Sequence, residues 1–289
     1  MLLATRYSLR DEVVMRGRNV HEKSRRNLLD YVNILSKYFP KSEKVSKTLK
    51  HRQSVALPRS DRARVVFKDL AEYLETVNVT QLSWNSTIWR EKFDAIEAKH
   101  GHPFPNSTVT NWVACRGSLP ILRGHTCGLW TTFHALTVNA FLQDGKKKDF
   151  DPKVVLKAIA GWVEFFFSCG PCAKHFRTMT RQDIPIDTWT RFPSDVVLYL
   201  WKAHNIVNAR LKGDNTEDPE HPKGQFPQRY ICPSCHVRAS NGTRDWSLRH
   251  VMTFLLRHYT DILPYGSSPT LQSPDSTGRA IFHVPANLP

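Results

Sequence analysis

The sequence lacks any apolar run long enough to cross a membrane. A spanning helix needs about 18 or more consecutive apolar residues, and the sharpest apolar patch, Val163 to Phe167, is interrupted by Glu164. The start, Met1 to Arg6, is too short an apolar run for a signal peptide, because charges follow at once from Arg10. The sequence therefore predicts no membrane span in this chain.

Nucleotide-binding glycine patterns and strong strand signals are also missing. None of the 13 glycines stands in a G-x-G-x-x-G sequence, so no Rossmann dinucleotide site is visible. Strand signals are weak and no internal repeat is evident. At the same time, 40% of the residues are hydrophobic and 23% are charged, which excludes a fully disordered or fibrous chain.

Aromatic residues are sparse where the positive charge gathers. The formal net charge is +15, and residues 1–65 carry +10 of it, with 16 basic and 6 acidic residues. Aromatic residues that could interleave with these basic groups, as in single-strand nucleic-acid binders, are limited there to Tyr7, Tyr31, Tyr38 and Phe39. We interpret the charge as a solvated helix face or a flexible arm, and we predict no nucleic-acid partner.

What the sequence does contain is apolar residues at helical spacing. The expected helices cover 27–39, 62–77, 127–142, 152–168, 170–181, 194–211 and about 245–260, with Ser194 as an N-cap. They predict an all-α fold, a four-helix bundle plus a short fifth helix. The expected organisation is a helix-rich basic lead-in region at 1–100, the bundle domain at 109–262 and a disordered tail at 263–289.

The six cysteines leave two interpretations open. Beside Cys115 and Cys127 there are two C-x-x-C pairs, Cys169–Cys172 and Cys232–Cys235. A zinc-binding structural or interaction module would use both pairs, although zinc pairs usually stand about 15–20 residues apart, and here 59 residues intervene.

The alternative is redox chemistry at Cys169-Gly170-Pro171-Cys172. This pair is expected at a helix start, where the helix N-terminus lowers a thiol pKa. Lys174, His175 and Arg177 add positive charge nearby. A dithiol that is repeatedly oxidised needs an electron acceptor, and a helical bundle can hold a flavin.

Two expected helix faces carry groups suited to a flavin. Trp130 and His134 are neighbours on one face, and the other holds Trp201, His204, Asn205 and Asn208. Taken singly, the tryptophans are better explained as core residues, and the histidines as core or surface residues. The combination with a helix-start cysteine pair favours a cofactor site.

Three motifs, in order, carry a resemblance to a known family. They are R-G-H-T-C-G-L-W-T-T-F-H over 123–134, C-G-P-C-A-K-H-F over 169–176 and W-K-A-H-N-I-V-N-A-R-L over 201–211. Together they resemble the Erv/ALR flavin-linked sulfhydryl oxidases. Residues 109–262 are similar to the Erv domain in the C-terminal half of the quiescin sulfhydryl oxidases, and residues 20–100 are similar to the helix-rich region upstream of it.

The resemblance implies FAD, bound non-covalently at the mouth of the bundle. It also implies a structural disulfide Cys115–Cys127 and a second C-x-x-C disulfide Cys232–Cys235, and no metal. Phe226 stands where the family often has Trp, so an indole contact is not carried over there. The implied flavin contacts are Arg123, Trp130, His134, His175, Trp201, His204, Asn205, Val207, Asn208 and Lys223.

The implied activity is thiol oxidation. A dithiol would attack the Cys169–Cys172 disulfide at Cys169, and Cys172 would pass two electrons to FAD and then to dioxygen, giving hydrogen peroxide. The quiescin enzymes carry thioredoxin-like domains ahead of this region, whereas this chain has no cysteine before Cys115. We therefore expect either a fragment or isoform, or a separate thioredoxin-like or protein-disulfide-isomerase-like donor. A third possibility is a degenerate oxidase that oxidises protein clients poorly.

Four N-x-S/T sequons are mild evidence for a secreted glycoprotein. They lie at Asn78, Asn85, Asn106 and Asn241. We expect the secretory pathway, in the lumen of the endoplasmic reticulum or Golgi, or secretion, if the N-terminus is incomplete.

Overall fold

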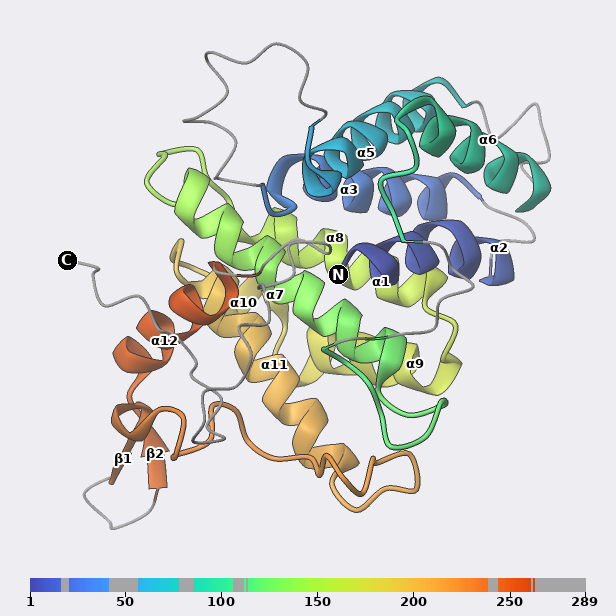
Figure 1. Cartoon of the computed structure of the whole chain (residues 1–289). Coiled ribbons are helices and arrows are strands. Elements are labelled where there is room, and N and C mark those ends of the chain that lie inside the picture. The colour runs from blue at the N-terminus through green and yellow to red at the C-terminus, as the bar shows by residue number, and fades with distance from the viewer. Residues whose placement is uncertain are drawn as a thin grey trace, which may run out of the picture.

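The computed structural model describes residues 1–16, 21–41, 57–77, 86–105, 112, 114–238, 244–260 and 262. Within these residues the fold is almost wholly helical (Figure 1), and the all-α prediction is confirmed. The predicted tail at 263–289 and the asparagines of all four sequons lie outside them. Among the described helices, none combines the length and the apolar character that a membrane span requires.

The predicted bundle is present, and its members are four helices plus a shorter fifth. α7 packs against α8, α11 and α12, and α8 packs against α9. Pro152 occupies the first turn of α8, and the Asp151 carboxylate caps it by accepting from the Lys153 N–H at 2.9 Å. The bounds are α7 Gly124–Asp144, α8 Pro152–Phe166, α9 Gly170–Thr178, α11 Asp195–Leu211 and α12 Leu248–Thr260.

The lead-in region contains more helices than the periodicity predicted. α3 (Glu22–Tyr38) and α5 (Arg59–Thr76) match the expected segments, whereas α1 (Leu2–Tyr7), η1 (Ser8–Glu12), α2 (Val13–Arg16) and α6 (Ser86–Lys99) were not foreseen. In α6 the signal existed, because buried Trp89, Phe93 and Ile96 follow helical spacing. The N-terminal helices pack between α6 and the bundle helices α7 and α8.

The lead-in region and the bundle share one hydrophobic core. Tyr31 of α3 stacks on Trp162 of α8 with ring centroids 5.2 Å apart. The buried Tyr38 hydroxyl donates to the Asp144 carboxylate at 2.7 Å, at the end of α7. The predicted lead-in region at 1–100 and the predicted bundle domain at 109–262 therefore contribute to the same core.

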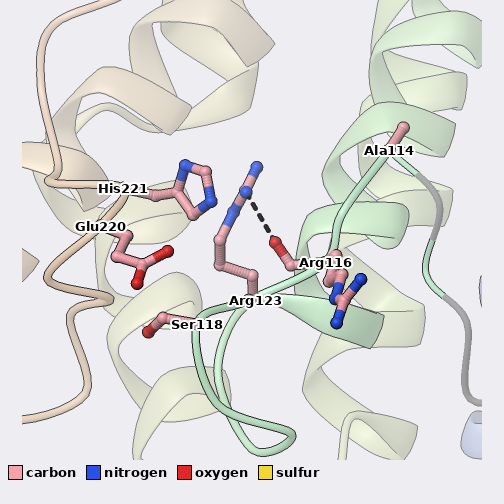
Figure 2. Close-up of a pocket in the computed structure, with 7 residues that line it drawn as sticks. Ala114, Arg116, Ser118, Arg123, Glu220 and His221 are labelled. Carbon is pink, nitrogen blue, oxygen red and sulfur yellow. Dashed lines mark hydrogen bonds between the residues drawn. The ribbon is translucent and has the colours of Figure 1, made fainter.

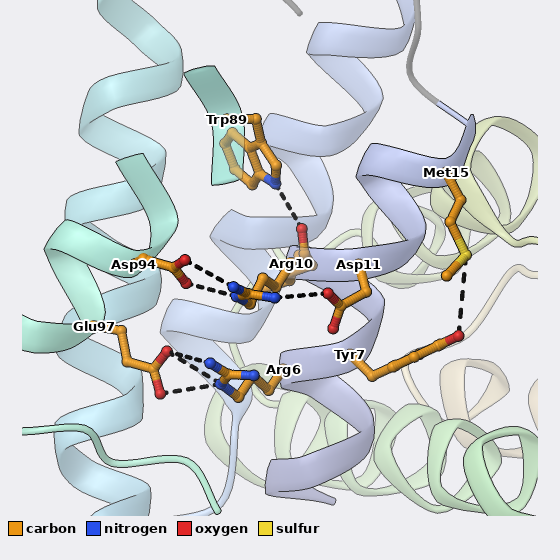
Figure 3. Close-up of polar contacts among 9 residues, drawn as sticks. Arg6, Tyr7, Arg10, Asp11, Met15, Trp89, Asp94 and Glu97 are labelled. Atoms are coloured by element: carbon orange, nitrogen blue, oxygen red, sulfur yellow. Dashed lines mark hydrogen bonds and ion pairs between the residues drawn. The ribbon is translucent and has the colours of Figure 1, made fainter. Parts of the chain in front are cut away.

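Part of the basic charge expected on a solvated face is instead paired within the fold. Arg6 pairs with the buried Glu97 at 3.0 Å, and Arg10 lies between Asp94 and Asp11 (Figure 3). These ion pairs join the N-terminal helices to α6, since Asp94 and Glu97 both belong to it. Residues 42–56, which hold much of the remaining lead-in charge, lie outside the described residues.

Three smaller features differ from the expectations. A short antiparallel hairpin pairs β1 (His236–Arg238) with β2 (Arg244–Trp246), His236 opposite Trp246. Ser194 makes no side-chain cap bond; the Asp195 carboxylate instead accepts from the N–H of Phe192 at 2.7 Å. The segment after α9 forms a π-helical turn, η3 (Met179–Asp183), and a short α10 (Ile186–Trp189).

Candidate functional site

The Cys169–Cys172 disulfide lies at the start of α9, as the sequence predicted. Cys169 is the N-cap residue, and its Sγ accepts from the backbone N–H of Cys172 at 3.3 Å. Both cysteines are half-buried. The free amides and dipole of a helix N-terminus stabilise negative charge, so the same amide can stabilise a Cys169 thiolate after reduction.

The basic residues after this pair do not all face it. Arg177 lies 3.8 Å from the Glu164 carboxylate of α8, and Arg181 pairs with the same carboxylate. Lys174 and His175 are exposed. Among the described residues, no hydrogen bond or ring contact joins His175 to the other predicted flavin residues, so its role stays a prediction.

The two predicted helix faces meet in an aromatic and imidazole cluster. Trp130 of α7 stacks on His204 of α11 with ring centroids 4.0 Å apart. Nε2 of His134 lies 3.0 Å from Nδ1 of His204. The Trp130 ring also meets Phe176 of α9 edge-on, at 6.2 Å. Phe176 is one helical turn after Cys172, so it connects the disulfide helix to the cluster.

Burial keeps these imidazoles neutral. Burial, with the nearby His204 and His258 rings, lowers the pKa of His134 well below its usual value. Burial, followed by the Lys223 charge, lowers the pKa of His204 to about 3. Nδ1 of His134 is buried and has no hydrogen-bond partner. The cluster therefore presents neutral rings and an unused polar atom in the interior.

Three of the predicted flavin residues on α11 bind a segment of their own chain. The Trp201 indole N–H and the Asn205 amide donate to the Phe226 carbonyl, at 2.5 and 2.8 Å. Asn205 also accepts from the Phe226 N–H at 2.7 Å, and Asn208 donates to the Gly224 carbonyl at 3.2 Å. These bonds hold the segment that follows Lys223. Val207 is half-buried against the core.

A polar pocket of about 430 Å³ opens beside the start of α7 (Figure 2). Arg123, the N-cap residue of α7, has a positive φ of 58° and donates to the Arg116 carbonyl at 2.9 Å. Burial and the Arg123 charge lower the pKa of Lys223, and the Glu217 and Asp218 carboxylates act in the opposite direction. Neither cation forms a salt bridge within the described residues. The remaining lining residues are Ala114, Gly117, Ser118, Glu220 and His221.

The other two cysteine pairs are also closed as disulfides. Cys115–Cys127 joins the loop before α7 to that helix. Cys232–Cys235 spans the short η4 turn (Pro233–Cys235), and both residues are buried, at 7% and 0% exposure. The described residues hold no group of three or more potential metal ligands. Closed disulfides favour the redox interpretation, because zinc binds thiolates.

The structure adds residues that sequence reasoning did not single out. Tyr259 of α12 stacks on His134 at 4.5 Å, and His258 contacts Tyr259 at 4.7 Å. The sequence predicted a helix over about 245–260 but could not say which of its rings would reach α7. Arg116 and His221 of the pocket carried no local signal, since both lie in loops.

Comparison with known proteins agrees with this geometry. Human sulfhydryl oxidase 2 is 33% identical over 241 residues, covering 81% of this chain and 30% of that protein. Chicken sulfhydryl oxidase 1 is 43% identical over 153 residues, covering 53% of this chain and 20% of that protein. The chain thus spans less than a third of the length of these curated relatives.

A solved structure described as a sulfhydryl oxidase fragment of human QSOX1 is similar over nearly the whole fold. The TM-score is 0.71 at 31% identity, covering 89% of this chain and 92% of that one. Residues 127–237, which include all but the first cysteine, match the model of the Erv1 / Alr family. The helical bundle, the motif order and these matches establish that the chain belongs to the Erv1/Alr family.

Proposed function

We propose that this chain is an FAD-dependent thiol oxidase that forms disulfides in dithiol substrates. The observation that carries the proposal is the Cys169–Cys172 disulfide at the N-terminus of α9, one helical turn from a ring that contacts the Trp130–His204 stack. Disulfides beside the N-terminus of a helix are suited to exchange, because the leaving thiolate is stabilised.

The residues near this pair fit a flavin nucleotide. The buried, unpartnered Nδ1 of His134 is a polar atom that a ligand can satisfy. Trp130 and His204 offer ring faces for an aromatic ligand. Arg123 and Lys223, whose charges interact and which form no salt bridge in the described chain, suit a pyrophosphate. We assign these residues to FAD binding. Residues of α11 support them from behind: Trp201, Asn205, Val207 and Asn208.

The first half of the reaction is thiol–disulfide exchange. A substrate thiolate attacks Sγ of Cys169, the Cys169–Cys172 bond breaks, and Cys172 leaves as a thiolate. The second substrate thiol then attacks the substrate sulfur of the mixed disulfide, which releases the oxidised substrate and a Cys169 thiolate. The Cys172 N–H, which already donates to Cys169 Sγ at 3.3 Å, stabilises this thiolate.

When bound, FAD would supply a two-electron acceptor that dioxygen can reoxidise, with hydrogen peroxide as the product. The protein provides the surroundings for this chemistry. Burial keeps His134 and His204 neutral, so they add no positive charge beside the rings. The segment held by Asn205 and Trp201 positions Lys223. We do not assign His175 as a base.

Reduced protein thiols, or a thioredoxin-like or protein-disulfide-isomerase-like donor, are the proposed electron donors. The three disulfides favour an oxidising compartment, so we propose the secretory pathway or the extracellular space. The second candidate is a zinc-binding module that uses reduced C-x-x-C pairs. Metal content per chain and flavin absorbance separate these two functions.

The experiment is oxygen uptake by the purified chain reconstituted with FAD, with dithiothreitol and then a reduced unfolded protein as substrates. We expect a yellow protein whose turnover is abolished by Cys169→Ser and by Cys172→Ser. The double variant Cys232→Ser with Cys235→Ser is the matched control, since it removes a C-x-x-C disulfide of the same span away from the cluster. A colourless chain that folds only with zinc, or full turnover in both single variants, would sink the proposal.

A further inference from the structure

A buried carboxylate from the N-terminal helices reaches the turn before the redox disulfide. Glu12, the last residue of η1, is 0% exposed. Its Oε1 accepts from the backbone N–H of Ser168 at 3.0 Å and from the Ser168 hydroxyl at 2.7 Å. Ser168 directly precedes Cys169, so Glu12 holds the residue next to the helix cap of α9.

The other carboxylate oxygen contacts the first turn of α7. Nε2 of His125 lies 2.8 Å from Oε2 of Glu12, and the Tyr7 ring meets the same imidazole edge-on at 4.6 Å. Glu12 thus joins three segments that are far apart in sequence, at separations of 113 residues to His125 and 156 residues to Ser168. One side chain fixes the turn before Cys169 against the helix that carries Trp130.

The charge of this carboxylate is costly at a buried position. A buried carboxylate is tolerated when hydrogen bonds and an opposite charge compensate it. Within the described residues, Glu12 forms no salt bridge with a lysine or arginine, and its partners are Ser168 and His125. These contacts compensate the buried carboxylate, and they fix its negative charge one residue before Cys169.

We propose that Glu12 is a positioning residue for the Cys169–Cys172 disulfide, holding the Ser168 turn in place and disfavouring the reduced, negatively charged pair. The inference rests on the proposed function of this pair as the redox centre. Reduction breaks the S–S bond with two electrons from the substrate dithiol, and the two sulfurs carry one proton when one of them is a thiolate. A fixed carboxylate nearby repels that thiolate, which favours passing the electrons on.

The test measures the thiol–disulfide equilibrium of the pair in wild-type protein, Glu12→Gln and Glu12→Ala. The chain is equilibrated in dithiothreitol redox buffers, and alkylation with mass spectrometry reports the reduced fraction of Cys169 and Cys172. Glutamine keeps the shape and removes the charge, so we expect an equilibrium shift of about tenfold toward the dithiol, the size of the repulsion between two unit charges about 12 Å apart at an effective dielectric constant of about 20. Alanine should also lower turnover with dithiothreitol.

Glu97→Gln is the matched control. Glu97 is another buried carboxylate of the lead-in region, at 3% exposure, and it pairs with Arg6 rather than with the cysteine turn. We expect Glu97→Gln to lower the melting temperature without moving the equilibrium. The double variant of Glu12→Gln with Ser168→Ala should shift the equilibrium no further than Glu12→Gln alone, because both act through one contact.

An equilibrium within twofold of wild type in Glu12→Gln, whatever its melting temperature, would overturn the proposal and leave Glu12 a structural residue. If Glu12→Ala does not fold, the equilibrium of the isosteric Glu12→Gln is the test. If neither variant folds, the equilibrium of Ser168→Ala is the test. That exposed position should move the equilibrium by about threefold, and an unchanged constant contradicts the proposal. A wild-type chain that takes up no oxygen, with a shifted Glu12→Gln equilibrium, would refute the oxidase function and leave the positioning role intact.

Discussion

Nε2 of His134 on α7 lies 3.0 Å from Nδ1 of His204 on α11, and the Trp130 ring covers His204 at 4.0 Å. The pair is 70 residues apart in sequence. Because burial keeps both imidazoles neutral, their proximity carries no charge repulsion at neutral pH. Protonation of either ring would introduce a charge into the interior beside the other ring, and this gives the fold a dependence on pH.

The first prediction concerns stability at acidic pH. The pKa of His204 is about 3 in the folded chain, against about 6.5 for an unperturbed histidine. Below pH 6.5 the His204 imidazole is therefore protonated in the unfolded chain but not in the folded chain. The free energy of unfolding falls progressively toward pH 3 as a result. At pH 5 this single group lowers the free energy of unfolding by on the order of 2 kcal/mol relative to its value above pH 6.5.

Denaturant unfolding at pH 7.5 and pH 5.0 checks this prediction. His204→Gln should lose less stability between the two pH values than the wild-type chain, since glutamine does not titrate. His134 and His258, whose pKa values are also lowered by burial, keep part of the effect in the variant. Equal losses in both proteins would contradict the assignment to His204.

The second prediction concerns the cation pair beside the pocket. Lys223→Met should weaken FAD binding about tenfold, because it removes one charge-assisted contact with a phosphate. It should also raise the pKa of His204, since the Lys223 charge is one cause of its depression. Titration of the apoprotein with FAD measures the first effect, and imidazole NMR signals measure the second.

The control for this prediction is Lys148→Met, which removes an exposed lysine on the loop between α7 and α8. This variant should leave the affinity for FAD and the pKa of His204 unchanged. Equal weakening of FAD binding in the two variants would mean that the chain's overall charge, rather than the Lys223 position, attracts the nucleotide.

The third prediction compares two asparagines on α11. Asn205→Ala removes two part-buried bonds to the backbone of Phe226, and we expect a loss of about 2–4 kcal/mol in unfolding free energy together with weaker FAD binding. Asn208 makes one exposed bond to Gly224, so Asn208→Ala should cost less than about 1 kcal/mol. Chemical denaturation gives both values. Similar losses would show that Asn205 does not hold the segment.

The fourth prediction concerns the Cys232–Cys235 disulfide. Its buried sulfurs are poorly placed for exchange with a substrate, and the Cys235 carbonyl accepts from the Ser247 N–H at 2.9 Å, next to α12. Replacing both cysteines with serine should lower stability by about 2 kcal/mol and keep turnover with dithiothreitol. Thermal unfolding and oxygen uptake measure the two effects. A stable variant without turnover would instead assign this pair to the electron path.

The principal helices of the fold were predictable, and so was the position of the Cys169–Cys172 pair. Spacing of apolar residues marked α3, α5, α7, α8, α11 and α12 within a few residues of their observed bounds. The Cys-Gly-Pro-Cys sequence after an apolar helix predicted the pair at the start of a helix, and Cys169 is the N-cap residue of α9. The motif resemblance predicted the Erv1/Alr family, which the comparisons confirm.

Other features had only weak or ambiguous signals. The N-terminal helices are four to six residues long, which is too short for apolar spacing to predict them. The hairpin strands have three residues each, too few for a pattern of alternation. Ser194 is the N-cap residue of α11 but makes no side-chain cap bond, and the Asp195 carboxylate accepts from the N–H groups of Arg191 and Phe192 because of the path that the chain takes before the helix.

The sequence by itself determined which residues share a helix face, because a helix repeats every 3.6 residues whatever surrounds it. It placed Trp130 with His134, and His204 with Asn208. Only the tertiary structure decided that these two faces meet, that Trp201 and Asn205 bind the Phe226 backbone, and that Glu12 reaches Ser168. Contacts between distant segments depend on how whole helices pack, and local spacing carries no information about that packing.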